Sequence, residues 1–135
     1  MEKFAKDLQA ILSAAVYAEA EVYERQAPRY DSGELAVSPP FVVYTCDMRG
    51  PQDEGGEWQG DLLLDVWALG SWKYCYSLMA MLDEALDGMA YRRESGTICT
   101  DRNGLVFQRM ERDPDDERIR RMSGQYLVRF NKEID

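Results

Sequence analysis

The sequence predicts an α+β fold, in which a mostly antiparallel sheet has two main helices packed on one face, in the order helix, strands, helix, strands. Three observations lead to this prediction. A strand pattern at 57–68 runs into a helical pattern at 72–86 after a two-residue break. Strand-like segments lie on both sides of this unit, and another amphipathic segment begins the chain. The 135 residues contain no internal repeat and have a length typical of one domain, so we expect a single domain over 1–135.

The central strand at 57–68 alternates in hydrophobicity, as expected for a strand with one buried face. Its even positions are apolar and its odd positions are mostly polar. Leu63 and Trp67 interrupt the polar positions, so we expect that face to be partly covered. Ser71 follows the strand and is a good helix N-cap, because its hydroxyl can accept a hydrogen bond from a free backbone N–H.

Two segments have the periodicity of amphipathic helices. The first covers residues 2 to about 18, and its apolar residues are Phe4, Leu8, Ile11, Leu12 and Ala15. The second begins at Trp72, and its apolar residues are Cys75, Leu78, Met79, Leu82 and Leu86. Gly88 lies where a left-handed residue would end this helix. Residues 18–25 fit either a continued first helix or a strand, and we favour a short strand at 20–26.

The strands before the central unit are predicted from turn signals and β-branched residues. Residues 28–40 are rich in proline, glycine and serine and predict an irregular connection. A strand begins at Phe41 and pairs with the central strand as an antiparallel hairpin, whose long polar tip is Arg49–Glu57.

After the second helix, residues 89–94 are expected to form a connector. A strand at 97–100 is expected to turn at Asn103-Gly104, which is a strong hairpin signal, and to return over 105–110. The last strand, at about 119–131, alternates clearly. Its apolar face consists of Met122, Tyr126, Val128 and Phe130, and its polar face of Arg121, Gln125 and Arg129.

Composition excludes several classes of partner. The net charge is −9, which argues against sequence-independent nucleic-acid binding and against an anionic membrane surface as a partner.

The three cysteines, Cys46, Cys75 and Cys99, are far apart and are expected to be reduced, with Cys75 buried on the helical stripe. The sequence shows no signal-peptide pattern and no membrane-spanning run, so we expect a cytoplasmic location.

Catalytic motifs are absent from the sequence. The chain has no histidine, so it has no Ser-His-Asp or Cys-His arrangement, and it has no phosphate-binding glycine loop. The acidic turn at 113–117 lacks the glycine and ligand spacing of a calcium loop. Asp61 and Asp65 share a strand face at a separation of about 13 Å, which is too far for paired-carboxylate chemistry. We expect no enzymatic activity, metal or cofactor.

The remaining signal is a surplus of aromatic and apolar residues, which is typical of a domain that another subunit partly covers. These residues are Leu63, Trp67, Trp72, Tyr74, Met81 and Tyr91. The polar hairpin tip is a second candidate contact. The candidate oligomer or tube interface therefore consists of Arg49, Gln52, Asp53, Glu54, Leu63, Trp67, Trp72 and Tyr74.

Four sequence segments, taken in order, resemble a known family. They are Pro39-Pro40-Phe41-Val42-Val43-Tyr44, Leu64-Asp65-Val66-Trp67, Leu82-Asp83-Glu84-Ala85-Leu86-Asp87-Gly88 and Tyr126-Leu127-Val128-Arg129-Phe130. Together with the N-terminal helix they resemble the tail-completion (tail terminator) proteins of long-tailed bacteriophages and prophages. The chain differs from that pattern in a longer stretch between the first helix and Phe41.

The resemblance implies a structural subunit that forms a ring, typically a hexamer, on the end of the tail tube. Its partners would be the tail tube protein and the head-completion (stopper) protein, and DNA would only pass through the ring. It implies no catalytic residues and no cofactor, and a location in the host cytoplasm during assembly and then in the virion tail. Two alternatives stay open: a monomeric cytoplasmic binding domain with an aromatic-lined ligand pocket, and another neck or minor tail protein.

Overall fold

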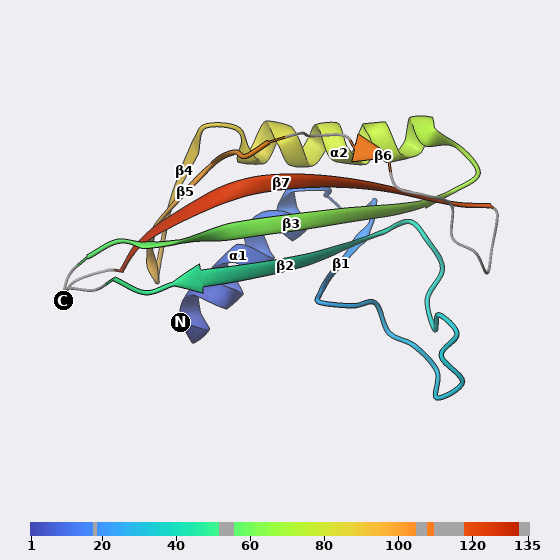
Figure 1. Cartoon of the computed structure of the whole chain (residues 1–135), viewed down its shortest axis with the longest axis horizontal. Coiled ribbons are helices and arrows are strands. Elements are labelled where there is room, and N and C mark those ends of the chain that lie inside the picture. Colours follow the sequence, from blue (N-terminus) through green and yellow to red (C-terminus); the bar gives the residue numbers. More distant parts are fainter. Residues whose placement is uncertain (18, 52–55, 105–107, 110–117, 133–135) are drawn as a thin grey trace.

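The computed structural model describes residues 1–17, 19–51, 56–104, 108–109 and 118–132 (Figure 1). The elements in order are α1 (Glu2–Ala15), β1 (Glu21–Glu24), β2 (Phe41–Arg49), β3 (Trp58–Leu69), α2 (Trp72–Leu86), β4 (Met89–Arg93), β5 (Gly96–Arg102), β6 (Gln108–Arg109) and β7 (Ile119–Lys132).

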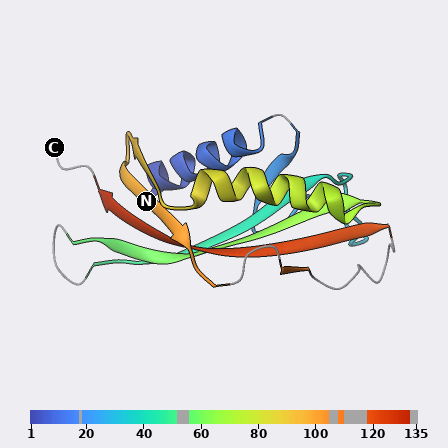
Figure 2. The ribbon, with the colours of Figure 1, turned by 90° about the horizontal axis from the view of Figure 1, so that it is seen from above.

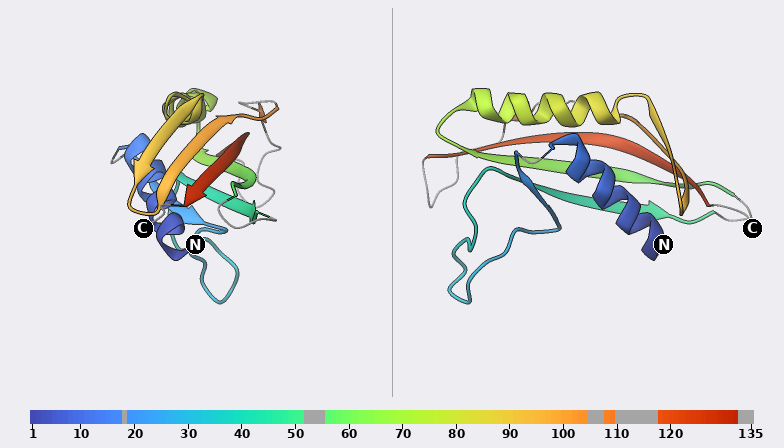
Figure 3. Two further views of the ribbon diagram at one scale, coloured as in Figure 1. Left: turned by 90° about the vertical axis from the view of Figure 1, so that its left-hand side faces the viewer. Right: turned by 180° about the vertical axis from the view of Figure 1, so that it is seen from behind.

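The strands form one mixed sheet in the order β1-β2-β3-β7-β5-β4, and the short β6 pairs with β7. Strands β1 and β2 run parallel, because the long connection at 25–40 carries the chain back to the end of the sheet where β1 began. The sheet also curls, so that its β4–β5 end approaches α1 (Figure 3). The predicted fold class, with a mostly antiparallel sheet, is therefore wrong: the chain forms a curled mixed sheet with two helices.

Both helices lie on one side of the sheet and enclose the main core (Figure 2). The predicted apolar stripes are buried there, including Leu8 and Leu12 of α1 and Leu78, Leu82 and Leu86 of α2. Helix α1 ends at Ala15 rather than near residue 18, because Tyr17 adopts a left-handed φ of 53° that a helix cannot continue.

The predicted strand-to-helix unit is confirmed in its details. Strand β3 alternates between buried and exposed residues, and α2 follows it after Gly70 and Ser71. The N–H of Lys73 donates to the Ser71 hydroxyl at 3.1 Å, so Ser71 is the N-cap. Gly88 has a φ of 62° just after the helix, which is the left-handed geometry expected at this position.

The β2–β3 hairpin is antiparallel as predicted, with pairs from Phe41 with Trp67 to Arg49 with Gln59. Strand β1 also agrees with the favoured strand at 20–26, although its parallel pairing was not foreseen. Gly60 permits the close approach of the two hairpin strands, because a Cβ atom on it would lie 2.1 Å from the Asp47 carbonyl oxygen.

Two predictions about the C-terminal half are wrong. Residues 89–93 form strand β4, which pairs with β5. The return from Asn103-Gly104 does not pair with β5, because β5 already lies between β4 and β7, and β6 pairs with β7 instead. Gly104 does have a positive φ of 81°, as the predicted turn requires. The segment after the turn pairs with β7 rather than with β5. Residues 105–107 and 110 lie outside the described part of the chain.

Candidate assembly surface

The face of the sheet opposite the helices, called here the outer face, carries the side chains that the main core does not use. In β2, β3 and β7, even-numbered residues face the helices and odd-numbered residues face outward. The outer face has two halves, because the connection at 25–40 covers the end near Trp67 and leaves the middle open.

The covered half is a second, smaller core. Trp67 is 7% exposed, and its ring stacks on Phe41 with centroids 5.1 Å apart. The guanidinium of Arg121 lies 4.1 Å from the Trp67 ring centroid, which is a cation–π geometry. Ala27, Leu35 and Val37 from the connection, together with Tyr23, Val43 and Ile119 from the sheet, complete this cluster. The expectation that the polar face of β3 is partly covered is confirmed, and the cover comes from the same chain.

The open half carries two leucines in a polar setting. Leu63 and Leu127 are 44% and 42% exposed, and they lie diagonally across β3 and β7, since Leu63 pairs with Gln125 and Leu127 pairs with Asp61. We call this area the outer patch, and its residues are Thr45, Asp47, Asp61, Leu63, Gln125 and Leu127. Exposed apolar side chains ringed by polar groups are typical of protein contact sites.

The outer patch is acidic. Asp47 and Asp61 lie directly opposite each other on β2 and β3, an arrangement of like charges that destabilises a strand pair. The amide of Asn103 donates to a carboxylate oxygen of Asp61 at 3.2 Å. Burial raises the pKa of the neighbouring Cys46 thiol to about 12, and Asp47 and Asp61 contribute to the rise. The patch therefore favours a contact that brings positive charge.

A shallow hollow of about 240 Å³ adjoins Leu63. Asp65 lies in it and pairs with Arg121 at 3.7 Å. Burial raises the pKa of Asp65, although the charge of Arg121 opposes this rise. The hollow marks the border between the covered half and the outer patch.

The candidate interface residues do not gather on one surface. Leu63 lies on the outer patch, whereas Trp67 lies within the second core and Arg49 ends β2 at the hairpin tip. Trp72 and Tyr74 lie at the start of α2, on the other side of the sheet and at the other end of the molecule from the hairpin tip (Figure 1). Gln52, Asp53 and Glu54 lie outside the described residues.

Sequence reasoning missed Leu127 and Asp47. Leu127 stands between Gln125 and Arg129 on the polar face of the last strand, which is the same signal that singled out Leu63. Asp47 carried no signal in the sequence, because its position opposite Asp61 depends on the hairpin register. Only the pairing of β2 with β3 shows that the patch is acidic.

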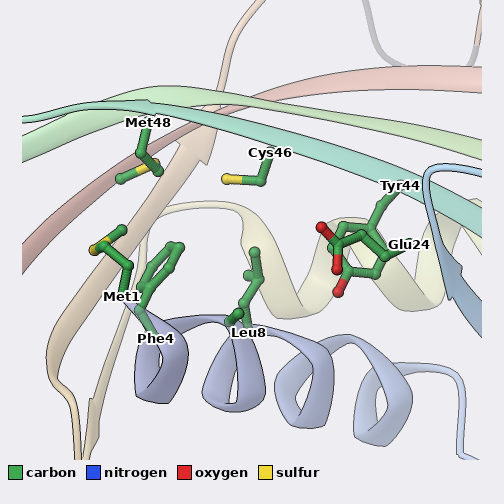
Figure 4. Close-up of a pocket in the computed structure, with 8 residues that line it drawn as sticks. Met1, Phe4, Leu8, Glu24, Tyr44, Cys46 and Met48 are labelled. Atoms are coloured by element: carbon green, nitrogen blue, oxygen red, sulfur yellow. The ribbon is translucent and has the colours of Figure 1, made fainter.

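Two hollows lie near the N-terminus of α1. One of about 180 Å³ lies between α1 and β2 and is mainly apolar (Figure 4). The other, of about 550 Å³, lies between the start of α1 and the β4–β5 turn and includes Trp58, Glu94 and Lys132. Trp67, Trp72 and Tyr74 line neither of these two hollows.

The strongest cluster of ionisable groups links α2 to the sheet. Asp83 of α2 accepts hydrogen bonds from both Arg102 on β5 and Tyr126 on β7. These hydrogen bonds, that of Arg102 first, lower the pKa of Asp83 despite its burial. All three groups are satisfied by one another, so the cluster has the character of a structural link rather than a reactive site.

Within the described ranges, no group of three or more histidine, cysteine, aspartate or glutamate residues is placed to hold a metal ion. No described helix has the length and apolar character needed to cross a membrane. A comparison of the chain with models of protein families finds no match, and neither does a comparison with curated proteins.

Proposed function

We propose that this chain is a structural tail-completion (terminator) protein of a long-tailed phage or prophage, whose copies form a hexameric ring as in the family it resembles. In this proposal the ring caps the tail tube and joins it to the head-completion protein, and it has no enzymatic role or cofactor. The outer patch is the observation that carries the proposal, because Leu63 and Leu127 are exposed side by side among carboxylates.

The charges on the outer face and on one edge of the sheet support a head-to-tail contact between copies. The outer patch is acidic through Asp47 and Asp61, whereas β4 at one edge of the sheet carries the exposed Arg92 and Arg93. If the patch of one copy meets β4 of the next, guanidinium groups approach the carboxylates and the leucines are covered. A contact between two different surfaces of identical chains closes into a ring when the rotation permits.

The shape of the β2–β3 hairpin fits a role at the end of a tube. The hairpin projects beyond both helices (Figure 2), and its tip is polar and rich in glycine. Such a projection can reach a neighbouring subunit or the tube end without disturbing the core. The net charge of −9 also suits a ring through which DNA passes, since like charges on the wall limit adhesion.

Tube growth in vitro tests this function. The tail tube protein encoded in the same phage or prophage genome is polymerised with and without this chain, and tube lengths are measured by negative-stain electron microscopy. We expect short, capped tubes with the wild-type chain and long tubes with the double variant Leu63→Asp, Leu127→Asp. A matched control, Tyr30→Asp, changes an exposed side chain on the 25–40 connection and should cap normally. Equal tube lengths with and without the wild-type chain would contradict the proposal.

A further inference from the structure

The edge of the sheet beside β1 is only half occupied. Strand β1 pairs with β2 from Phe41 to Tyr44, while β2 continues to Arg49. The Arg25 N–H donates to the Tyr44 carbonyl at 2.7 Å, so the backbone groups of Tyr44 point to this edge. Because strand residues alternate in direction, those of Cys46 and Met48 point the same way. In the described part of the chain no strand pairs with this edge beyond Tyr44.

An apolar groove runs beside this open edge on the helix side. It has a volume of about 180 Å³ and lies between α1 and β2. Met1, at the N-cap of α1, and Phe4 and Leu8 of α1 point toward Cys46 and Met48 of β2 (Figure 4). An unpaired edge next to an apolar groove under a helix is a suitable site for an added strand, whose backbone bonds the edge and whose side chains enter the groove.

We infer that the added strand is the same segment of a second copy, so that two β2 strands pair antiparallel across a two-fold axis at Met48. In this arrangement Met48 opposes Met48 of the second copy, and their side chains lie on the helix side near the groove. Cys46 of each copy opposes Gly50 of the other, and backbone groups at all these positions point to the shared edge.

Charge selects this register. Pairing about Met48 places Asp47 directly opposite Arg49 of the second copy, and the symmetry makes this contact twice. Pairing about Asp47 would instead oppose two aspartates, next to Asp61 in each copy. Pairing about Cys46 would place Met48 of the second copy opposite Tyr44, whose carbonyl is already bonded to Arg25. Of the three registers, only the one about Met48 pairs opposite charges and leaves β1 in place.

The contact does not depend on the ring proposed above. It uses the open edge of β2 rather than the outer face, and of the residues it pairs, Asp47 also belongs to the outer patch. It would cover the remaining open edge of β2, which otherwise is a template for uncontrolled pairing. The strand pairing would place Arg49 of the second copy directly opposite each Asp47, whose partner within its own sheet is Asp61.

Native mass tests the inference on the full chain. Sedimentation equilibrium across a range of concentrations should show a species of twice the chain mass of 15.6 kDa. Met48→Pro should weaken this dimer at least about tenfold, because it removes the edge N–H from both copies while leaving the bonds to β3. Met48→Ala keeps the edge N–H and is the matched control for loss of the side chain, so it should weaken the dimer less.

A charge exchange tests the register without touching the backbone. Asp47→Arg alone and Arg49→Asp alone each create two like-charge contacts and should weaken the dimer about tenfold or more. The double variant restores opposite charges and should return the dissociation constant to within about threefold of the wild type. Asp31→Arg, an equal change of charge on the exposed 25–40 connection, should have no effect.

Disulfide trapping completes the test. In a background with Cys46→Ser and Cys99→Ser, Met48→Cys should form a disulfide between two chains, because directly opposite residues lie within reach of such a bond. Arg49→Cys in the same background should not, since these positions are offset along the strands by about 6.6 Å in addition to the strand separation. A wild-type chain that stays monomeric, or a dimer that Met48→Pro and the single charge variants leave intact, would overturn the inference.

Discussion

The hydroxyl of Tyr126 donates a hydrogen bond of 2.9 Å to the carboxylate of Asp83, in the interface between β7 and α2. Tyr126 is fully buried and Asp83 is 8% exposed. Arg102 completes the group by donating from two nitrogen atoms to the same carboxylate. A buried carboxylate is costly unless it is paired and hydrogen-bonded, and here Arg102 from β5 and Tyr126 from β7 meet that need.

Tyr126→Phe should lower the free energy of unfolding by about 1–2 kcal/mol, because it removes one hydrogen bond to a charged group and keeps the ring in the core. Asp83→Ala should cost more, since it leaves the Tyr126 hydroxyl buried without its acceptor. Urea unfolding followed by circular dichroism measures both values. A loss from Tyr126→Phe of less than about 0.3 kcal/mol would show that the hydrogen bond adds nothing net to stability.

The pH dependence of stability should reveal the same carboxylate. Its pKa lies below the ordinary value of 3.8 in the folded protein, chiefly through the hydrogen bond from Arg102. Asp83 therefore stabilises the fold fully above a pH of about 4, and the contribution is lost as the pH falls through the lowered pKa. The difference in unfolding free energy between wild type and Asp83→Asn should shrink below that pH. A difference that stays constant from pH 7 to pH 3 would contradict this assignment.

Leu82→Ala should lower the free energy of unfolding by about 2–5 kcal/mol, because Leu82 is fully buried where α2 meets the sheet. Glu84→Ala, two residues away on the exposed side of the same helix, should change it by less than about 0.5 kcal/mol and is the matched control. Similar losses for both variants would show that the stability of α2 depends on helix propensity rather than on this packing.

The reactivities of the three thiols should differ in the folded protein. Burial raises the pKa of Cys75, and it raises the pKa of Cys46 to about 12, so both stay protonated and slow to react at pH 8. Cys99 is half-buried on the outer face of β5 and should be the first to react with a thiol reagent. The fast phase should disappear in Cys99→Ser. Rapid labelling of Cys75 without denaturant would contradict its place in the core.

The parts of the fold that local sequence determines were predicted correctly. Ser71 caps α2, Gly88 ends it and the even positions of β3 are buried, because each depends on a few neighbouring residues. The parallel pairing of β1 was missed, since it depends on where the connection at 25–40 leads the chain. Strand β4 was missed because it is an edge strand, and four of its five residues are exposed, which leaves no alternation to read.

The candidate surface likewise could be predicted only where it depends on neighbouring residues in the sequence. Leu63 was found because it breaks the alternation of its strand, and it is exposed on the outer patch. Trp67 breaks the same alternation four residues later, yet it is covered by Phe41 and by the 25–40 connection. The pattern shows that a polar face carries an apolar residue, but it does not show whether the cover comes from the same chain or from a partner.

Alanine substitutions at Trp67 and Leu63, which lie on the same strand, should therefore have different effects on stability. Trp67→Ala should lower the free energy of unfolding of the isolated chain by about 3–5 kcal/mol, because it removes the centre of the second core. Leu63→Ala should change it by less than about 0.5 kcal/mol, since Leu63 is 44% exposed and lies outside both cores. Both values are measured by urea unfolding under conditions in which the chain is monomeric, or at matched concentrations if it is not. A small loss for Trp67→Ala would return this residue to the candidate interface, whereas a large loss for Leu63→Ala would mean that the outer patch is already covered in the folded chain.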